Sequence, residues 1–152
     1  MLLEQASELV SLEEFDEAFH IYNKILREDP KNTNALIDNG VTLQRIGKNT
    51  QSIKYFNRAL KLEPKNIDGL IGKGSALHAL GKFSNAIACY DIVLEINSKF
   101  PVALAYKGLS LAEQGKIKDA LKFFKMALTI DKNYDLAQIS KKKALELLKS
   151  KK

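Results

Sequence analysis

Residues 33–66 read TNALIDNGVTLQRIGKNTQSIKYFNRALKLEPKN, and this stretch decides the fold. Leu36, Gly40 and Leu43 are separated by four and three residues, so they share one face of a first helix. Gly47 can adopt the left-handed conformation that ends a helix. A second apolar stripe follows and stops at a proline, which cannot continue a helix interior. The stretch therefore predicts two antiparallel helices joined by a short turn.

The same landmarks return every 34 residues. The glycine of the first helix comes back as Gly74 and Gly108, and the turn Gly47-Lys48 comes back as Gly81-Lys82 and Gly115-Lys116. A fixed period of this size is the signature of a stacked array. Each helix pair can bury its apolar faces only when its neighbours stack on it. The sequence therefore predicts an all-α repeat fold.

The whole chain of 152 residues is expected to form one domain. The first repeat would begin just before Met1, so we expect its first helix to lack its opening residues, as in a fragment of a longer array. The last helix has Lys142 at the place of the repeated glycine, and we expect it to be a capping helix with a polar outer face. Its buried stripe is predicted to be Leu136, Ala144, Leu147 and Leu148. The predicted repeats cover about residues 1–32, 33–66, 67–100 and 101–134, with the capping helix at about 135–149.

This pattern resembles the tetratricopeptide repeat, a 34-residue helix pair with small, aromatic and proline positions. The chain departs from the family pattern where a leucine is expected before each glycine, since it has Asn39, Lys73 and Lys107 there. The resemblance implies a right-handed α-solenoid, a superhelix of antiparallel helix pairs. The matching residues are the three helix glycines, the alanines Ala18, Ala86 and Ala120, the aromatics Tyr22, Phe56, Tyr90 and Phe124, and the prolines Pro30 and Pro64.

The glycines inside the first helices need a reason, because each costs about 1 kcal/mol relative to alanine. We expect that two helices approach closely at each glycine. The small residues Ala86 and Ala120 are predicted to provide the matching surface on the partner helix.

In this family, first helices of successive repeats line a concave groove that binds a peptide or a partner helix. A helical wheel places a second stripe of each first helix away from the core of its own pair. We expect Gly72 to be a notch that admits a partner side chain and Tyr106 to be an anchor. An alternative for Ile37, Ile71 and Ala105 is that they pack first helix against first helix. The predicted groove residues are Asn34, Ile37, Asp38, Val41, Gln44, Arg45, Asp68, Ile71, Gly72, Ser75, His78, Val102, Ala105, Tyr106 and Leu109.

Some family members hold a partner's C-terminal carboxylate with lysine, asparagine and arginine side chains along this groove. The corresponding positions here are Leu3, Ser7, Asp38, Asp68 and Gly72, so that clamp is absent. The resemblance thus implies a protein or peptide partner that is not a carboxylate-clamp ligand.

The charge is unevenly distributed along the chain. Lysine and arginine number 24 and aspartate and glutamate 18, for a net charge of +6, but acids dominate the first residues and lysines the last. A nucleic-acid groove would be basic throughout, so RNA binding is the less favoured alternative. Complementary ends also suggest self-association, helped by exposure of Leu2, Leu3, Ala6 and Leu9. A third alternative is a recruitment arm of a larger multidomain enzyme.

The chemically reactive residues do not form a recognisable active site. His20 and His78 lie in different repeats, Cys89 is the only cysteine, and residues 72–75 (GKGS) lie inside a predicted helix rather than a phosphate loop. We therefore expect no catalysis, no cofactor and no metal. The start of the chain lacks a secretory signal, and no run of eighteen apolar residues occurs, so we expect a cytoplasmic protein that does not enter membranes.

Overall fold

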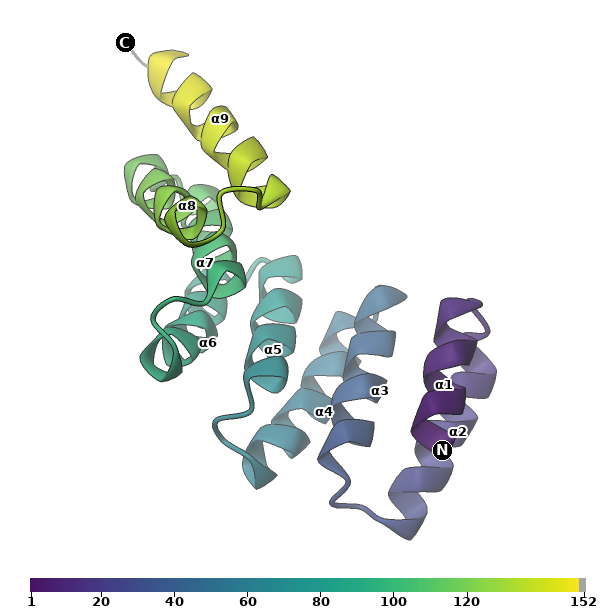
Figure 1. Cartoon of the computed structure of the whole chain (residues 1–152). Coiled ribbons are helices and arrows are strands. Elements are labelled where there is room, and N and C mark those ends of the chain that lie inside the picture. The colour runs from purple at the N-terminus through teal and green to yellow at the C-terminus, as the bar shows by residue number, and fades with distance from the viewer. Residues whose placement is uncertain (151–152) are drawn as a thin grey trace. The chain divides into compact units, whose positions relative to one another are not determined.

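The computed structural model describes residues 1–150, and within that range all regular structure is helical. Figure 1 shows the helices, whose limits follow the predicted repeats. The predicted all-α repeat fold is therefore confirmed. The nine helices of the described residues are α1 (Leu2–Ser11), α2 (Phe15–Glu28), α3 (Thr33–Arg45), α4 (Asn49–Leu62), α5 (Ile67–Ala79), α6 (Phe83–Ile96), α7 (Pro101–Glu113), α8 (Ile117–Ile130) and α9 (Asp135–Ser150).

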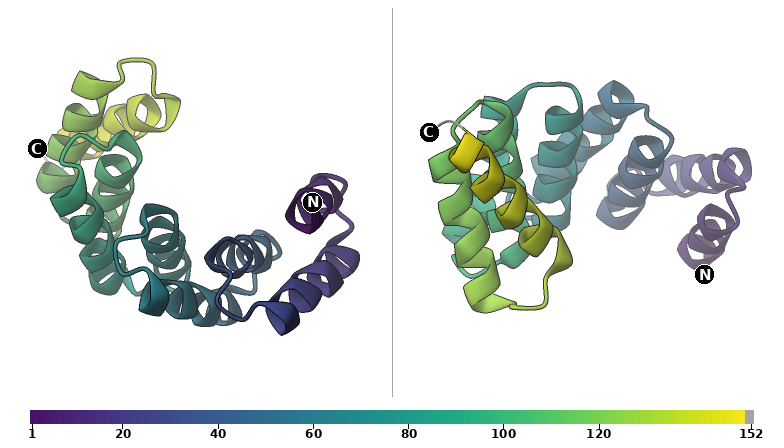
Figure 2. Two further views of the ribbon diagram at one scale, coloured as in Figure 1. Left: turned by 60° about the horizontal axis from the view of Figure 1, so that its bottom comes forward. Right: turned by 90° about the horizontal axis from the view of Figure 1, so that it is seen from above.

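The helices form two compact units, one from Met1 to Ala76 and one that begins at Leu77, so the division falls inside α5. In the first unit, α1 packs against α2, α2 against α3, and α3 against α4. In the second unit, α7 packs against α6 and α8, and α9 lies on α8 and α7, as both views of Figure 2 show. Within each unit, every first helix thus packs against the second helix that follows it.

Left-handed glycines end the first helices, as predicted. The φ angles of Gly47, Gly81 and Gly115 are 82°, 77° and 80°. After Gly115, the next amide donates to the carbonyl of Leu111 at 2.9 Å, which satisfies an otherwise unpaired helix end. In the first pair the same place is taken by Glu13, a non-glycine residue with a φ of 61°. This corner therefore carries a backbone strain that the other three avoid.

The glycines inside the first helices are sites of close approach, but not to alanine. A Cβ added to Gly40 would lie 2.8 Å from Cε1 of Phe56, and one added to Gly108 would lie 2.5 Å from Cε1 of Phe124. The predicted pairing of these glycines with small residues is thus wrong, although Ala120 is fully buried nearby. The aromatic ring of the second helix lies against the bare Cα, which is why no side chain fits there.

The aromatic rings form the centres of the buried clusters in both units. Phe56 packs in the first unit with Leu26, Leu36 and Ile37. Phe124 packs in the second unit with a cluster that includes Ala144 of α9. Helix α9 therefore uses the face that a first helix uses to join the preceding pair.

Two features of α9 differ from the prediction. Leu147, expected in the core, is 40% exposed, whereas Ala137 and Ser140 are buried. The outer face is not fully polar, because Ile139 is 67% exposed and Leu145 is 38% exposed. These apolar groups have no following second helix to cover them within the described residues.

The apolar residues of α1 also differ from the prediction. Ala6 is fully buried, and Leu3 and Leu9 pack partly buried against its cluster. The exposed apolar side chains of this region are instead Met1 and Leu12. The expectation that the buried face of α1 is open to solvent is therefore wrong.

Candidate functional site

One stripe of α3 faces solvent. Asn34, Asp38, Val41 and Arg45 are spaced by four, three and four residues, which places them on one side of the helix. Val41 is 47% exposed despite being aliphatic, and Asp38 is half-buried. Ile37, by contrast, is buried in the cluster around Phe56. The packing alternative is therefore confirmed for Ile37, and the outward stripe of α3 is narrower than predicted.

The corresponding part of α5 is open at some positions only. Asp68 is exposed, and Ile71 and Ser75 are half-buried. Gly72 is buried, and a Cβ there would lie 2.5 Å from Cζ of Phe56. The predicted notch at Gly72 is therefore wrong, because an aromatic ring of the protein itself occupies that space.

The stripe of the first unit is acidic. Burial raises the pKa of the Asp38 carboxyl, and the nearby negative charge of Asp68 raises it further. At the end of the stripe, Arg45 donates from Nη1 to the carbonyl of Val10 at 3.3 Å, and its guanidinium lies 5.8 Å from the ring centre of Phe15. The cation is thus placed beside the α1–α2 turn. The remaining predicted residue, Gln44, is half-buried.

The stripe of α7 in the second unit is more apolar. Val102, Tyr106 and Leu109 are half-buried, and the exposed Glu113 continues their spacing. The Tyr106 ring meets Tyr90 edge-on, with ring centres 5.8 Å apart, so it is supported from behind. Ala105 is fully buried in a cluster with Ala137, so packing is confirmed for this residue as well.

An apolar pocket opens between α7, α8 and α9, with a cavity volume of about 180 Å³. We call it the α7–α9 pocket. Its residues on α9 were not predicted, although the repeat period gives a signal for them: Ser140, Lys143 and Leu147 stand 34 residues after Tyr106, Leu109 and Glu113. The outward stripe therefore continues onto α9. The pocket is lined by Leu109, Ala112, Glu113, Ile117, Phe124, Ser140, Lys143, Ala144 and Leu147.

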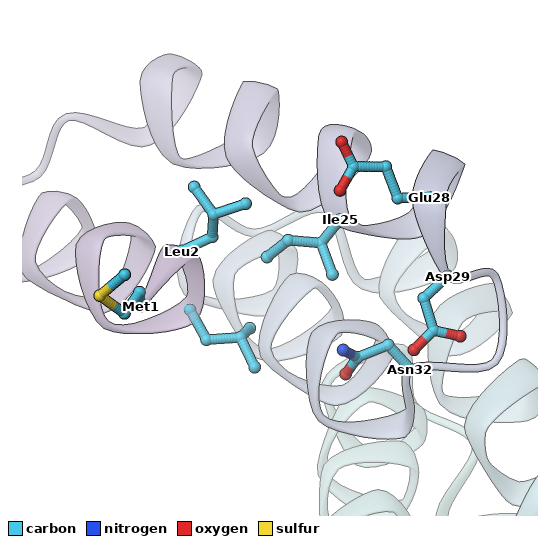
Figure 3. Close-up of a pocket in the computed structure, with 7 residues that line it drawn as sticks. Met1, Leu2, Ile25, Glu28, Asp29 and Asn32 are labelled. Atoms are coloured by element: carbon cyan, nitrogen blue, oxygen red, sulfur yellow. The ribbon is translucent and has the colours of Figure 1, made fainter.

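A second cavity of about 300 Å³ lies at the start of α1 (Figure 3). Met1, Leu2, Leu3 and Ile25 provide its apolar wall, and Glu28, Asp29 and Asn32 provide its polar wall. Asn32 is already used by the fold, since its Oδ1 accepts a hydrogen bond from the amide of Ala35 at 3.0 Å. The α1 residues in register with the outward stripe are Glu4, Ser7 and Ser11, none of which lines this cavity. It is therefore separate from the predicted groove.

The reactive side chains serve packing. Nδ1 of His78 lies 2.8 Å from Oγ of Ser110, and its ring meets Phe83 edge-on. Ser110 is fully buried, so this serine–histidine pair cannot reach a substrate. Cys89 is buried, and residues 72–75 lie inside α5. Across residues 1–150, no cluster of histidine, cysteine and acidic side chains could hold a metal ion, and no helix is long and apolar enough to span a membrane.

The repeats match a known family, and the fold matches known structures. The crystal structure of MamA protein is 22% identical with a TM-score of 0.84, covering 95% of this chain and 79% of that one. A tetratricopeptide repeat protein from Parabacteroides merdae is 23% identical with a TM-score of 0.80, covering 91% of this chain and 56% of that one. The first tetratricopeptide repeat domain of Spaghetti (RPAP3), bound to an HSP90 peptide, is 21% identical with a TM-score of 0.73, covering 79% and 95%.

No curated protein matches the sequence. The family match is to the tetratricopeptide repeat, over residues 3–67, 37–100 and 71–135. These overlapping matches take in every helix from α1 to α8 and reach the start of α9. The chain therefore belongs to the tetratricopeptide repeat family.

Proposed function

We propose that this protein is a non-catalytic interaction module of the cytoplasm that binds a peptide or a partner helix on the outward stripes of its first helices. The observation that carries the proposal is the exposure of one register while the other faces are buried. Val41 is 47% exposed on α3, and Leu109 borders an open pocket on α7, whereas Ile37 and Ala105 are buried. Apolar side chains held in this way favour contact with another chain.

The two units offer surfaces of different chemistry. In the first unit, Asp38 and Asp68 make the stripe acidic, which favours a basic or neutral segment and disfavours a free carboxylate terminus. In the second unit, Tyr106 and the α7–α9 pocket offer an aromatic and apolar surface suited to an aliphatic anchor of an amphipathic helix or extended peptide. A transient affinity near micromolar corresponds to about −8 kcal/mol.

The RPAP3 domain supports peptide binding as a use of this fold, because it holds an HSP90 peptide. Its ligand is not carried over to this chain. The positions that would form a carboxylate clamp are Leu3, Ser7, Asp38, Asp68 and Gly72, and none of them is a cation or an asparagine. We therefore propose a protein or peptide partner of another type.

The test is capture of partners from native lysate with the wild type and with the double variant Val41→Glu, Leu109→Glu. The matched control is Leu62→Glu, Ile92→Glu, which changes two residues on second helices that are each 40% exposed. We expect the groove variant to lose partners that the control retains, with equal helical circular dichroism in all three proteins. Equal capture by both variants would contradict the proposal. Binding of single-stranded RNA that weakens steeply with salt would favour the RNA-binding alternative instead.

A further inference from the structure

We propose that the protein assembles head to tail, with Leu12 of one copy inserted into the α7–α9 pocket of a second copy. The donor surface is the α1–α2 corner, which we define as residues 11–15. The inference goes beyond the proposed function, because it concerns contact between copies rather than capture of a foreign partner. It also uses residues on α1 and α9 that the groove prediction does not include.

The α1–α2 corner presents Leu12 on an ordered turn. Leu12 is 62% exposed, far more than the other leucines of α1, which pack against the core. The backbone around it is fixed by amide bonds from Leu12 to Glu8 at 3.1 Å, from Glu13 to Val10 at 3.1 Å and from Glu14 to Leu9 at 2.8 Å. An anchor held in place before binding loses little conformational freedom when it is buried.

The α7–α9 pocket has the size and lining for such an anchor. Its volume of about 180 Å³ is close to that of an engineered apolar cavity of about 150 Å³ that binds benzene. Ile117, Phe124 and Ala144 provide apolar floor and walls, and Leu109 and Leu147 stand at the sides. Leu147 is 40% exposed, so both partners of the contact would remove apolar surface from water.

The charges around the two surfaces are complementary in both directions. Beside Leu12 stand the carboxylates of Glu13 and Glu14, and the Arg45 guanidinium is held at the corner by its bond to Val10. The pocket has Lys143 and Glu113 in its lining. The corner carboxylates can therefore meet Lys143 while Arg45 meets Glu113. Close opposite charges of this kind select one partner and one orientation.

Other exposed apolar residues lack this combination. Ile139 is 67% exposed on α9, but it does not line the pocket. The donor and acceptor surfaces lie on different parts of the chain, so the contact is heterologous and each copy keeps one unused surface. Such a contact produces rings or open chains rather than a closed twofold dimer.

Analytical ultracentrifugation tests the proposal. The wild type should show a mass that rises with concentration beyond a dimer and falls at high salt, because salt screens the charge pairs. Leu12→Ser and Leu147→Glu should each weaken association by about tenfold or more, the effect of losing one buried anchor. The matched control Ile139→Ser should associate like the wild type. A wild type that is monomeric at every concentration would overturn the proposal.

A charge exchange identifies the contact itself. Glu14→Lys and Lys143→Glu should each weaken association, and the two changes in one chain should restore it, since every interface then again joins opposite charges. Cysteines placed at Leu12 in one chain and at Leu147 in another should cross-link only when the two chains are mixed. Association that ignores Leu12→Ser and shows no rescue would also overturn the proposal, and would direct attention to the cavity in Figure 3.

The outcome is separable from that of the proposed function. Partner capture by Leu12→Ser reports on the groove alone, because Leu12 is not among the predicted groove residues. If assembly fails while capture still depends on Val41 and Leu109, head-to-tail contact is wrong and the groove proposal stands. If assembly behaves as expected and no foreign partner is captured, only the groove proposal fails.

Discussion

Gly108→Ala is the smallest change that tests the close approach of a first helix to an aromatic ring. The added Cβ would lie 2.5 Å from Cε1, 2.8 Å from Cδ1 and 3.1 Å from Cζ of Phe124. The ring is 1% exposed, so it cannot move aside without disturbing its cluster. Overpacking of this kind costs about 1–3 kcal/mol, and the better helix propensity of alanine returns about 1 kcal/mol. Because three ring carbons are too close, we expect a net loss of about 1–2 kcal/mol.

The assay is urea unfolding followed by circular dichroism, with Gly69→Ala as the matched control. A Cβ at Gly69 would lie 3.1 Å from Cδ2 of Leu60, the far end of a flexible side chain. Leu60 can rotate away, so this variant should be neutral or gain up to about 1 kcal/mol. Adding Phe124→Leu to Gly108→Ala should cost less than the two single changes together, because both act on one contact. Equal stability of the two alanine variants would refute the reasoning.

Three further outcomes are expected. Glu13→Gly should raise the free energy of unfolding by about 1 kcal/mol and Gly115→Ala should lower it by a similar amount, because both positions have a left-handed φ; urea titration showing the reverse signs would contradict this. Lys107 forms an ion pair of 2.6 Å with the part-exposed Asp91, so Lys107→Met should cost about 1 kcal/mol or less, and the loss should shrink in high salt. The folded state raises the pKa of Asp38 and so binds its proton more tightly, which means that wild-type stability falls as pH rises from the unfolded pKa of about 4 through the higher folded value. Thermal melts should therefore show Asp38→Asn more stable than the wild type at about pH 7 but not at about pH 3; an equal difference at both pH values would contradict this.

The helix limits could be predicted because they depend on local chemistry. Gly47 marks the end of α3 by its backbone freedom, and Pro64 lies just beyond the end of α4. Glu13 was missed for the same reason, since nothing in its residue type indicates a left-handed turn. Its place is visible only through the period, 34 residues before Gly47.

The partner of the repeated glycine could not be predicted from residue type. A missing side chain on one helix suggested a small residue on the other, and Ala120 was available at a suitable place. The structure places the Phe124 ring there instead. A flat ring and a bare Cα fit as closely as two small residues do, and only the relative position of the helices decides which of the two contacts forms.

Burial on α9 follows register more closely than hydrophobicity. Leu147 looks like a core residue, yet its register is that of Arg45, Ala79 and Glu113, and all four are exposed. In the same way, Ile139 shares the register of the buried Ile37 and Ala105 but is 67% exposed, because no second helix follows α9 among the described residues. An aliphatic side chain in a register that every repeat leaves open adds nothing to the core. Leu147 is therefore better explained by contact with another chain than by folding, and the α7–α9 pocket is the surface on which that contact would be made.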